Sequence, residues 1–170
     1  MEEILNKVAN SGLLTFNLED YYDDSEKVSI DFKELLFQGL ILKEKDFRLY
    51  VKEENWENYS GKQVALYCST DAIIPTWAFM LVANKLEPFA KEVFFCNPEE
   101  LDMVLFYKIL QSIDLSKYKD QRVVVKGCSN LPVPVSAYVE ITKKLTPIVK
   151  SIFYGEPCST VPIYKKRPVK

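Results

Sequence analysis

The sequence QVALYC, residues 63–68, is a nearly continuous apolar run that ends at a cysteine. Such a run is typical of a parallel strand that is covered on both faces. Runs of the same kind follow at residues 92–96, 122–128 and 150–154. The intervals between them have the length of a strand, a crossover helix and two loops. The sequence therefore predicts four parallel strands.

Helical segments separate these runs. Pro75 is suited to the first turn of a helix that we expect to reach about Ala90, and Asn97 and Pro98 have the residue types of a second helix start. Residues 136–149 have the apolar spacing of a third helix. The alternation predicts an α/β fold, a three-layer, doubly wound, mostly parallel sheet that is Rossmann-like and has the strand order 2-1-3-4.

The first 60 residues have a different pattern of apolar residues. Short apolar runs at 13–16 and 28–31 predict two strands, and residues 43–54 have the spacing of a helix. We expect these elements to form an α+β extension that packs on the core. The sequence thus predicts three parts, in order an N-terminal extension of residues 1–60, a βαβαβαβ core of residues 61–164, and a basic tail of residues 165–170 that frays.

Composition limits the classes of function. The chain has 170 residues, of which 48% are hydrophobic and 27% charged, and these are values of a globular protein. A net charge of −2 gives no reason to expect nucleic acid or a membrane as a partner. The acidic start, Met1-Glu2-Glu3, differs from the basic start of a secretory signal. We expect a cytoplasmic protein with reduced thiols, and a homo-oligomer is compatible with these features.

The chain contains no histidine. This excludes catalytic triads with histidine and zinc sites with histidine ligands. The five glycines never form the spacing of a dinucleotide fingerprint or a P-loop. Chemistry at a site must therefore come from thiols, carboxylates, lysines, tyrosines or backbone amides.

Three of the four cysteines share a local pattern. Cys68, Cys128 and Cys158 each follow or closely follow a strand-like run, and each is followed by serine and then by a loop with proline. The carboxyl ends of parallel strands lie at one edge of a sheet, and the order 2-1-3-4 would gather these three thiols there. Cys96 falls nearer an edge of that sheet, and we expect it to pack in the core.

Three thiolates suit a soft metal, either zinc or an iron–sulfur cluster with one open position. Hydroxyls and backbone amides at helix starts can donate to cluster sulfur. The predicted metal ligands are Cys68, Cys128, Cys158, Asp71 and Glu156. The predicted cofactor-binding hydroxyls are Ser69, Ser129 and Ser159.

Four stretches resemble an uncharacterised bacterial family, known as the domain of unknown function 2480. They are NKVANSGL at 6–13, LFQGLILKEKDFR at 36–48, VKGCS at 125–129 and YGEPCSTVP at 154–162. The resemblance covers nearly the whole chain and brings no known activity. It implies a role close to iron–sulfur cluster assembly, with assembly proteins as partners.

The sequence leaves three functions open. The first is an accessory protein that binds a metal or an iron–sulfur cluster through strand-end thiolates. The second is a thiol-dependent enzyme or a Rossmann-like protein that binds a small molecule. In the enzyme, the nucleophile would be Cys128 or Cys68, activated by a helix N-terminus and Lys126. The third is a protein-interaction module whose cysteines only pack.

Overall fold

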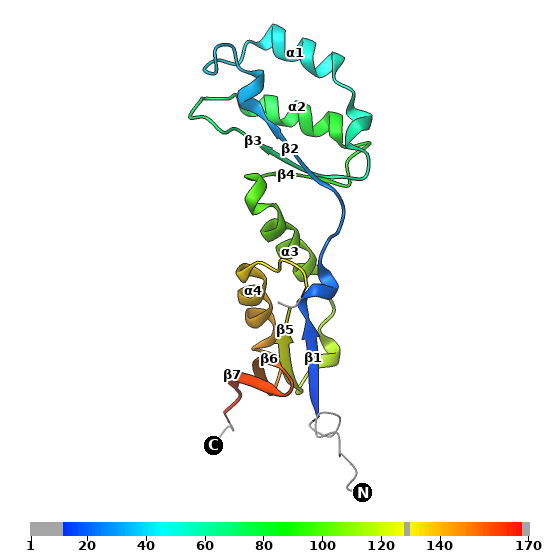
Figure 1. The fold of residues 1–170 in the computed structure, drawn as a ribbon, viewed down its shortest axis with the longest axis vertical. Helices are drawn as coiled ribbons and strands as arrows, with labels where there is room; N and C mark the ends of the chain where they lie inside the picture. Colours follow the sequence, from blue (N-terminus) through cyan, green and yellow to red (C-terminus); the bar gives the residue numbers. More distant parts are fainter. Residues whose placement is uncertain (1–11, 128–129, 168–170) are drawn as a thin grey trace, which may run out of the picture. The chain divides into compact units, whose positions relative to one another are not determined.

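The computed structural model describes residues 12–127 and 130–167 and divides the chain into two compact units (Figure 1). Unit 1 combines the two ends of the chain, Met1–Asp23 and Leu105–Lys170. Unit 2 is the continuous segment Asp24–Val104. Within the described parts of the chain, no helix is both long and apolar enough to cross a membrane.

Unit 2 contains a three-stranded parallel sheet in the order β2-β3-β4. Its strands are β2 (Lys27–Asp31), β3 (Gln63–Tyr67) and β4 (Glu92–Phe95). The helix α1 (Glu44–Glu53) leads from β2 to β3, and α2 (Thr76–Leu86) leads from β3 to β4. Apolar side chains of the sheet and of both helices form one core cluster. Its buried members are Ile30, Phe32, Phe47, Val51, Trp56, Val64, Leu66, Ala78, Val82 and Leu86.

Unit 1 contains a four-stranded sheet in the order β1-β5-β6-β7. The strands are β1 (Leu13–Asn17), β5 (Arg122–Lys126), β6 (Ser151–Glu156) and β7 (Ser159–Lys165). The first three are parallel, whereas β7 pairs antiparallel with β6. The helices are α3 (Leu101–Ser112), which begins within unit 2 and continues in unit 1, and α4 (Val135–Leu145).

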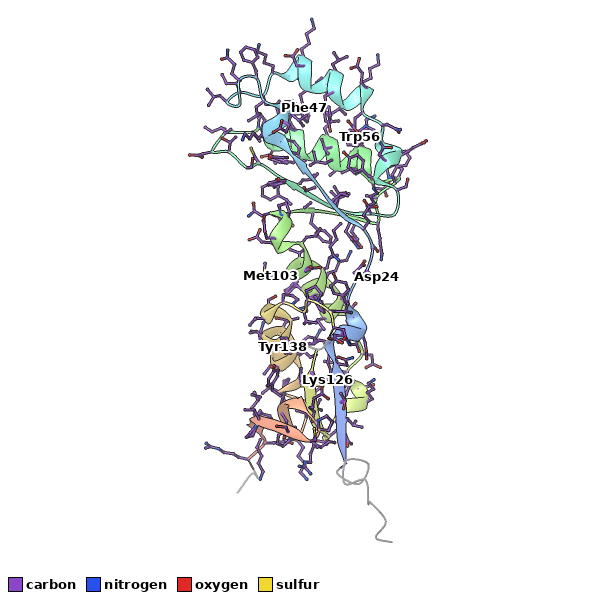
Figure 2. All side chains as sticks on the ribbon, viewed as in Figure 1. Asp24, Phe47, Trp56, Met103, Lys126 and Tyr138 are labelled. Carbon is purple, nitrogen blue, oxygen red and sulfur yellow. The ribbon has the colours of Figure 1, made fainter. Side chains whose placement is uncertain are left out.

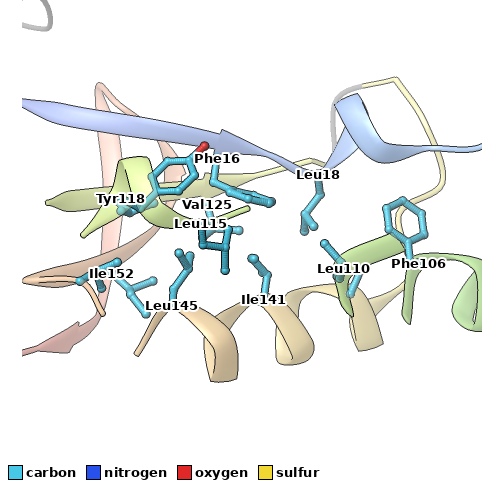
Figure 3. Packing of buried hydrophobic residues seen from close by; sticks show 13 residues of the cluster. Phe16, Leu18, Phe106, Leu110, Leu115, Tyr118, Val125, Ile141, Leu145 and Ile152 are labelled. Carbon is cyan, nitrogen blue, oxygen red and sulfur yellow. The ribbon is translucent and has the colours of Figure 1, made fainter. Parts of the chain in front are cut away.

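The core of unit 1 lies between one face of its sheet and the helices. Figure 3 shows Phe16 and Ile152 from the strands opposite Ile141 and Leu145 from α4. Leu110 from α3 joins the same cluster. All five side chains are at most 1% exposed, so they form the buried centre of unit 1.

The two units repeat one arrangement. The strands β5 and β6 and the helix α4 begin at residues 122, 151 and 135, and their counterparts β3, β4 and α2 begin at residues 63, 92 and 76. The difference is 59 residues in each case. The buried positions also correspond, because Ala78, Val82 and Leu86 of α2 match Ala137, Ile141 and Leu145 of α4.

The repeat extends to the turns. Gly61, with φ +71°, corresponds to Asp120, with φ +55°. The amide of Gly61 donates to the carbonyl of Phe89 at 2.9 Å, and that of Asp120 donates to the carbonyl of Ile148 at 2.8 Å. In both turns, therefore, a residue with positive φ donates the equivalent hydrogen bond. The fold is an internal duplication, with unit 2 inserted after the first strand of unit 1.

The α/β class with parallel sheets is confirmed, but the single sheet in the order 2-1-3-4 needs correction. The four strands predicted for one sheet lie in two, with β3 and β4 in unit 2 and β5 and β6 in unit 1. Each unit has one core cluster on one face of its sheet in the described residues, which differs from the predicted three layers. The physical reason is that β3 pairs with β2 and β4, and β5 pairs with β1 and β6, so neither strand has an edge left for the other.

The predicted parts of the chain have other roles in the structure. Segment 1–60 contributes one strand to each sheet instead of forming an extension of its own. Within the tail 165–170, Lys165 ends β7 and pairs with Ser151, while residues 168–170 lie outside the described range. The strand β7 was not foreseen, although Gly155 and Pro157 lie between two β-like runs.

Candidate functional site: a thiol pocket in unit 2

A cavity of about 390 Å³ lies at the carboxyl ends of β3 and β4. Open parallel sheets bind ligands at this edge, so the position is the one expected of a site. We call this cavity the thiol pocket, because two cysteines line it. Its lining residues are Tyr67, Cys68, Thr70, Ala72, Ile74, Phe79, Phe95, Cys96, Asn97 and Glu100.

Strand pairing brings the two cysteines to one place. Cys68 follows the last residue of β3, and Cys96 follows the last residue of β4. The amide of Cys96 donates to the carbonyl of Leu66 at 3.2 Å, which extends the ladder beyond β4. Neighbouring strands are about 4.8 Å apart, and therefore residues that end adjacent strands share one edge. Both thiols are half-buried.

Asp31, the last residue of β2, holds the loop that begins at Cys68. Its Oδ1 accepts hydrogen bonds from the amide of Ser69 at 3.0 Å and from the amide of Lys33 at 2.9 Å. Burial acts to raise the pKa of Asp31, but the hydrogen bonds from the Ser69 side chain and from both amides outweigh it. The pKa of Asp31 is therefore lowered, and the ionised carboxylate fixes the loop.

Aromatic rings form one wall of the thiol pocket. The rings of Phe79 and Phe95 meet edge to face, with centroids 5.0 Å apart and an interplanar angle of 75°. At the equivalent positions of unit 1, Tyr138 and Tyr154 have centroids 5.8 Å apart and an angle of 72°. Figure 2 labels Tyr138 on α4. A cavity of about 310 Å³ lies beside this second pair, so both halves of the duplication have a pocket with an aromatic pair.

The charge of the thiol pocket comes from Glu100. Its Oε2 accepts hydrogen bonds from the amide of Asn97 at 2.9 Å and from Asn97 Nδ2 at 3.1 Å. Burial, and secondly the nearby Glu100, raise the pKa of the Cys96 thiol. Cys96 is thus a neutral thiol at neutral pH. A carboxylate at the rim also disfavours an anionic ligand.

The described residues that were predicted to form one site belong to two different units. Cys68, Ser69 and Asp71 lie in the loop after β3 of unit 2. At the turn between β6 and β7 of unit 1 lie Glu156, Cys158 and Ser159, where Glu156 pairs with Lys126 at 3.4 Å. Cys128 and Ser129 are outside the described residues. The three thiols were expected at one edge of a single sheet. This expectation assumed that β3, β5 and β6 share a sheet, but β3 belongs to one sheet and β5 and β6 belong to the other.

Among the described residues, no three His, Cys, Asp or Glu side chains form a group that could hold a metal ion. Cys96 was expected only to pack, yet it lines the same pocket as Cys68. The sequence did carry a signal for this pairing. Cys68 and Cys96 end two consecutive strands, and consecutive strands joined by one crossover helix are commonly neighbours.

The family comparison agrees with the resemblance seen in the sequence. Residues 2–166 match the model of a family described as "Protein of unknown function (DUF2480)". No curated protein and no solved structure matches the chain. Evidence about function therefore rests on the geometry of the pocket.

Proposed function

The chain belongs to the DUF2480 family, and we propose that it is a small-molecule-binding protein whose ligand occupies the thiol pocket of unit 2. The observation that carries the proposal is the pocket itself. Its volume of about 390 Å³ is in the range of ligand sites, and it lies at the ligand-binding edge of a parallel sheet.

The lining indicates the class of ligand. Phe79 and Phe95 offer an apolar wall, whereas Thr70 and Asn97 offer polar groups. Glu100 adds a negative charge at the rim. These groups favour an uncharged or cationic molecule with one apolar face. As part of this proposal, the protein acts in the cytoplasm, where its thiols stay reduced.

The thiols serve as contacts in this proposal and not as nucleophiles. A nucleophilic cysteine needs a lowered pKa. The pKa of Cys96 is raised by burial and by Glu100, which is the opposite direction. A binding protein therefore fits the pocket better than an enzyme that attacks its substrate with Cys96.

A pocket-filling variant tests the proposal. We expect Ala72→Phe to occupy the pocket with its ring and to abolish ligand retention. Asn84→Phe places the same side chain on the exposed surface of α2, outside the pocket lining, and serves as the matched control. Each protein is incubated with a cellular extract of molecules below about 1 kDa, a limit that includes the size range of pocket ligands. Native mass spectrometry then measures which proteins retain an added mass.

The wild type and Asn84→Phe should retain the same added mass, and Ala72→Phe should lose it. Retention by all three proteins, or by none, contradicts the proposal. Circular dichroism of Ala72→Phe is needed beside the binding data, because a lost fold would also remove the ligand.

A soft metal is the second candidate, and the observation in its favour is that two thiols line one pocket. Cys68 and Cys96 would be two ligands of zinc or of an iron–sulfur cluster, and the others would come from a bound molecule or a partner. This candidate includes the link to iron–sulfur assembly that the family resemblance implies. Ligation would require Cys96 to lose its proton, against the direction of its pKa shift.

Metal analysis with an absorption spectrum, on protein purified without oxygen, separates the two candidates. Bound metal should be lost in Cys68→Ser and in Cys96→Ser. It should be kept in Cys158→Ser, because this exposed thiol lies in unit 1. Equal loss in all three variants would reject the pocket as the metal site.

A further inference from the structure

A second cavity, of about 420 Å³, has a different character from the thiol pocket. It lies in unit 1, where β5 and β6 begin and β7 ends. Its lining residues are Arg122, Lys150, Ser151, Phe153, Lys165 and Lys166. We call it the basic groove, because four of these six residues are cationic and none is acidic.

The sheet register sets the positions of the charges. Arg122 of β5 pairs with Ser151 of β6, and Ser151 pairs with Lys165 of β7. Cross-strand partners point to the same face, so Arg122 and Lys165 flank Ser151 in one row. The amide of Lys166 donates to the carbonyl of Lys150 at 2.9 Å, which brings these two lysines to the end of that row.

Like charges in neighbouring positions of a sheet repel each other. Lys166 has a carboxylate nearby, since its Nζ lies 3.6 Å from Asp120 Oδ1. In the described residues, the ammonium groups of Lys150 and Lys165 have no carboxylate within ion-pair distance. The positive charges of these two lysines are therefore uncompensated within the groove, and a bound anion would neutralise them.

Unit 2 provides an internal comparison. In the duplicated fold, Arg122 and Ser151 correspond to Gln63 and Glu92. The two partner strands pair in the same register, yet the corresponding pair in unit 2 carries no cation. In the sequence, unit 1 has 13 Lys and Arg against 9 Asp and Glu, a net charge of +4, whereas unit 2 has 9 against 15, a net charge of −6. The fold therefore does not require the positive charge of the groove.

We propose that the basic groove binds a compact polyphosphate group, either as a free anion or as part of a nucleotide. The guanidinium of Arg122 lies over the ring of Phe153 at 5.7 Å, which orients its planar donors. A guanidinium so held can donate two parallel hydrogen bonds to a phosphate. The lysines neutralise the remaining charges, and the volume suits a small molecule.

Titration calorimetry with tripolyphosphate and with ATP tests this proposal on the full chain. We expect saturable binding that weakens as sodium chloride rises from about 50 mM to about 200 mM, because phosphate contacts are screened by salt. The double variant Arg122→Gln, Lys165→Gln should weaken binding by about tenfold or more, since two charge-assisted contacts are lost.

Lys85→Gln is the matched control for a lost positive charge, because Lys85 is exposed on α2 of unit 2. It should leave both affinities unchanged. Tighter binding of ATP than of tripolyphosphate identifies a nucleotide as the source of the phosphates, and equal binding identifies the free anion.

The proposal is overturned by an absence of saturable binding at low salt, or by an equal loss in Lys85→Gln. It is also overturned if a single-stranded RNA binds more tightly than both probes, because the groove would then belong to a polymer surface. None of these results bears on the thiol pocket, which lies in the other unit and takes a ligand of different charge.

Discussion

Gly127 shows how closely the backbone of β5 approaches its surroundings. A Cβ atom at this position would lie 2.7 Å from Leu18 Cβ and 3.2 Å from Tyr138 Oη. The first distance is shorter than any normal contact between carbon atoms. The position, directly after β5, therefore needs glycine.

We expect Gly127→Ala to lower the free energy of unfolding by about 2 kcal/mol or more, because the added methyl group would overlap the fully buried Leu18. Gly61→Asn is the control. Gly61 has open space around its Cα, and Asp120 occupies the equivalent left-handed position, so the cost should stay below about 1 kcal/mol. Urea unfolding followed by circular dichroism measures both, and equal losses would contradict the steric argument.

Asp31 links stability to pH. Its pKa is lower in the folded protein than in the unfolded chain, so its contribution is present above the unfolded pKa of about 4 and is lost as the pH falls through the folded pKa. Asp31→Asn should therefore be less stable than the wild type at about pH 7, and this difference should shrink below about pH 3.

Asp71→Asn is the control for Asp31→Asn, because Asp71 is an exposed acid in the same loop. It should show little difference from the wild type at either pH. The urea unfolding midpoints of the wild type, Asp31→Asn and Asp71→Asn, measured at about pH 7 and below about pH 3, test this expectation. A constant gap between Asp31→Asn and the wild type would assign the effect to shape and not to charge.

At the scale of elements, the duplicated helices α2 and α4 are set by the same buried positions. Leu86 and Leu145 are both fully buried and end their helices at equivalent places. Both positions follow from helical spacing in the sequence. The strand pairing does not, because an apolar strand such as β3 has the same composition whichever neighbour it takes.

Leu145→Ala should lower the free energy of unfolding by about 2–5 kcal/mol, because Leu145 is fully buried in the unit 1 core and its truncation leaves a cavity there. Leu86→Ala should have an effect of similar size in unit 2. Val139→Ala, on the exposed side of α4, should cost less than about 0.5 kcal/mol. Chemical unfolding of the three variants measures these changes, and a large effect at Val139 would contradict the assigned helix face.

At the scale of the molecule, each unit has its own hydrophobic core in the described residues. Unit 2 is continuous in sequence, and unit 1 is assembled from both ends of the chain. A domain with its own core and a continuous chain is expected to fold by itself. The division at residues 24 and 104 differs from the one expected near residue 60.

Residues 24–104, produced alone, should therefore give a helix and strand signal by circular dichroism and a cooperative unfolding transition. The same segment with Leu86→Ala should be much less stable, which distinguishes a packed core from residual structure. A non-cooperative transition of the unaltered segment would show that unit 2 depends on unit 1.

The local structure of the chain can be predicted from its residues in order. Apolar runs and helical spacing placed β3, β4, α2 and α4. These features depend on neighbouring residues, so they can be read along the chain. An offset of 59 residues also relates the two halves, with proline at 75 and 134 and leucine at 86 and 145.

Which strands are neighbours, in contrast, depends on how the whole chain packs. The expected sheet is divided in two, and Cys68 and Cys96 line one pocket of unit 2, whereas Cys158 belongs to unit 1. Strand partners are distant in sequence, and the free energy that selects them comes from the packing of the whole core. The sequence therefore predicts that a cysteine at a strand end lies at the edge of a sheet. Which other side chains lie at the same edge depends on how the strands assemble.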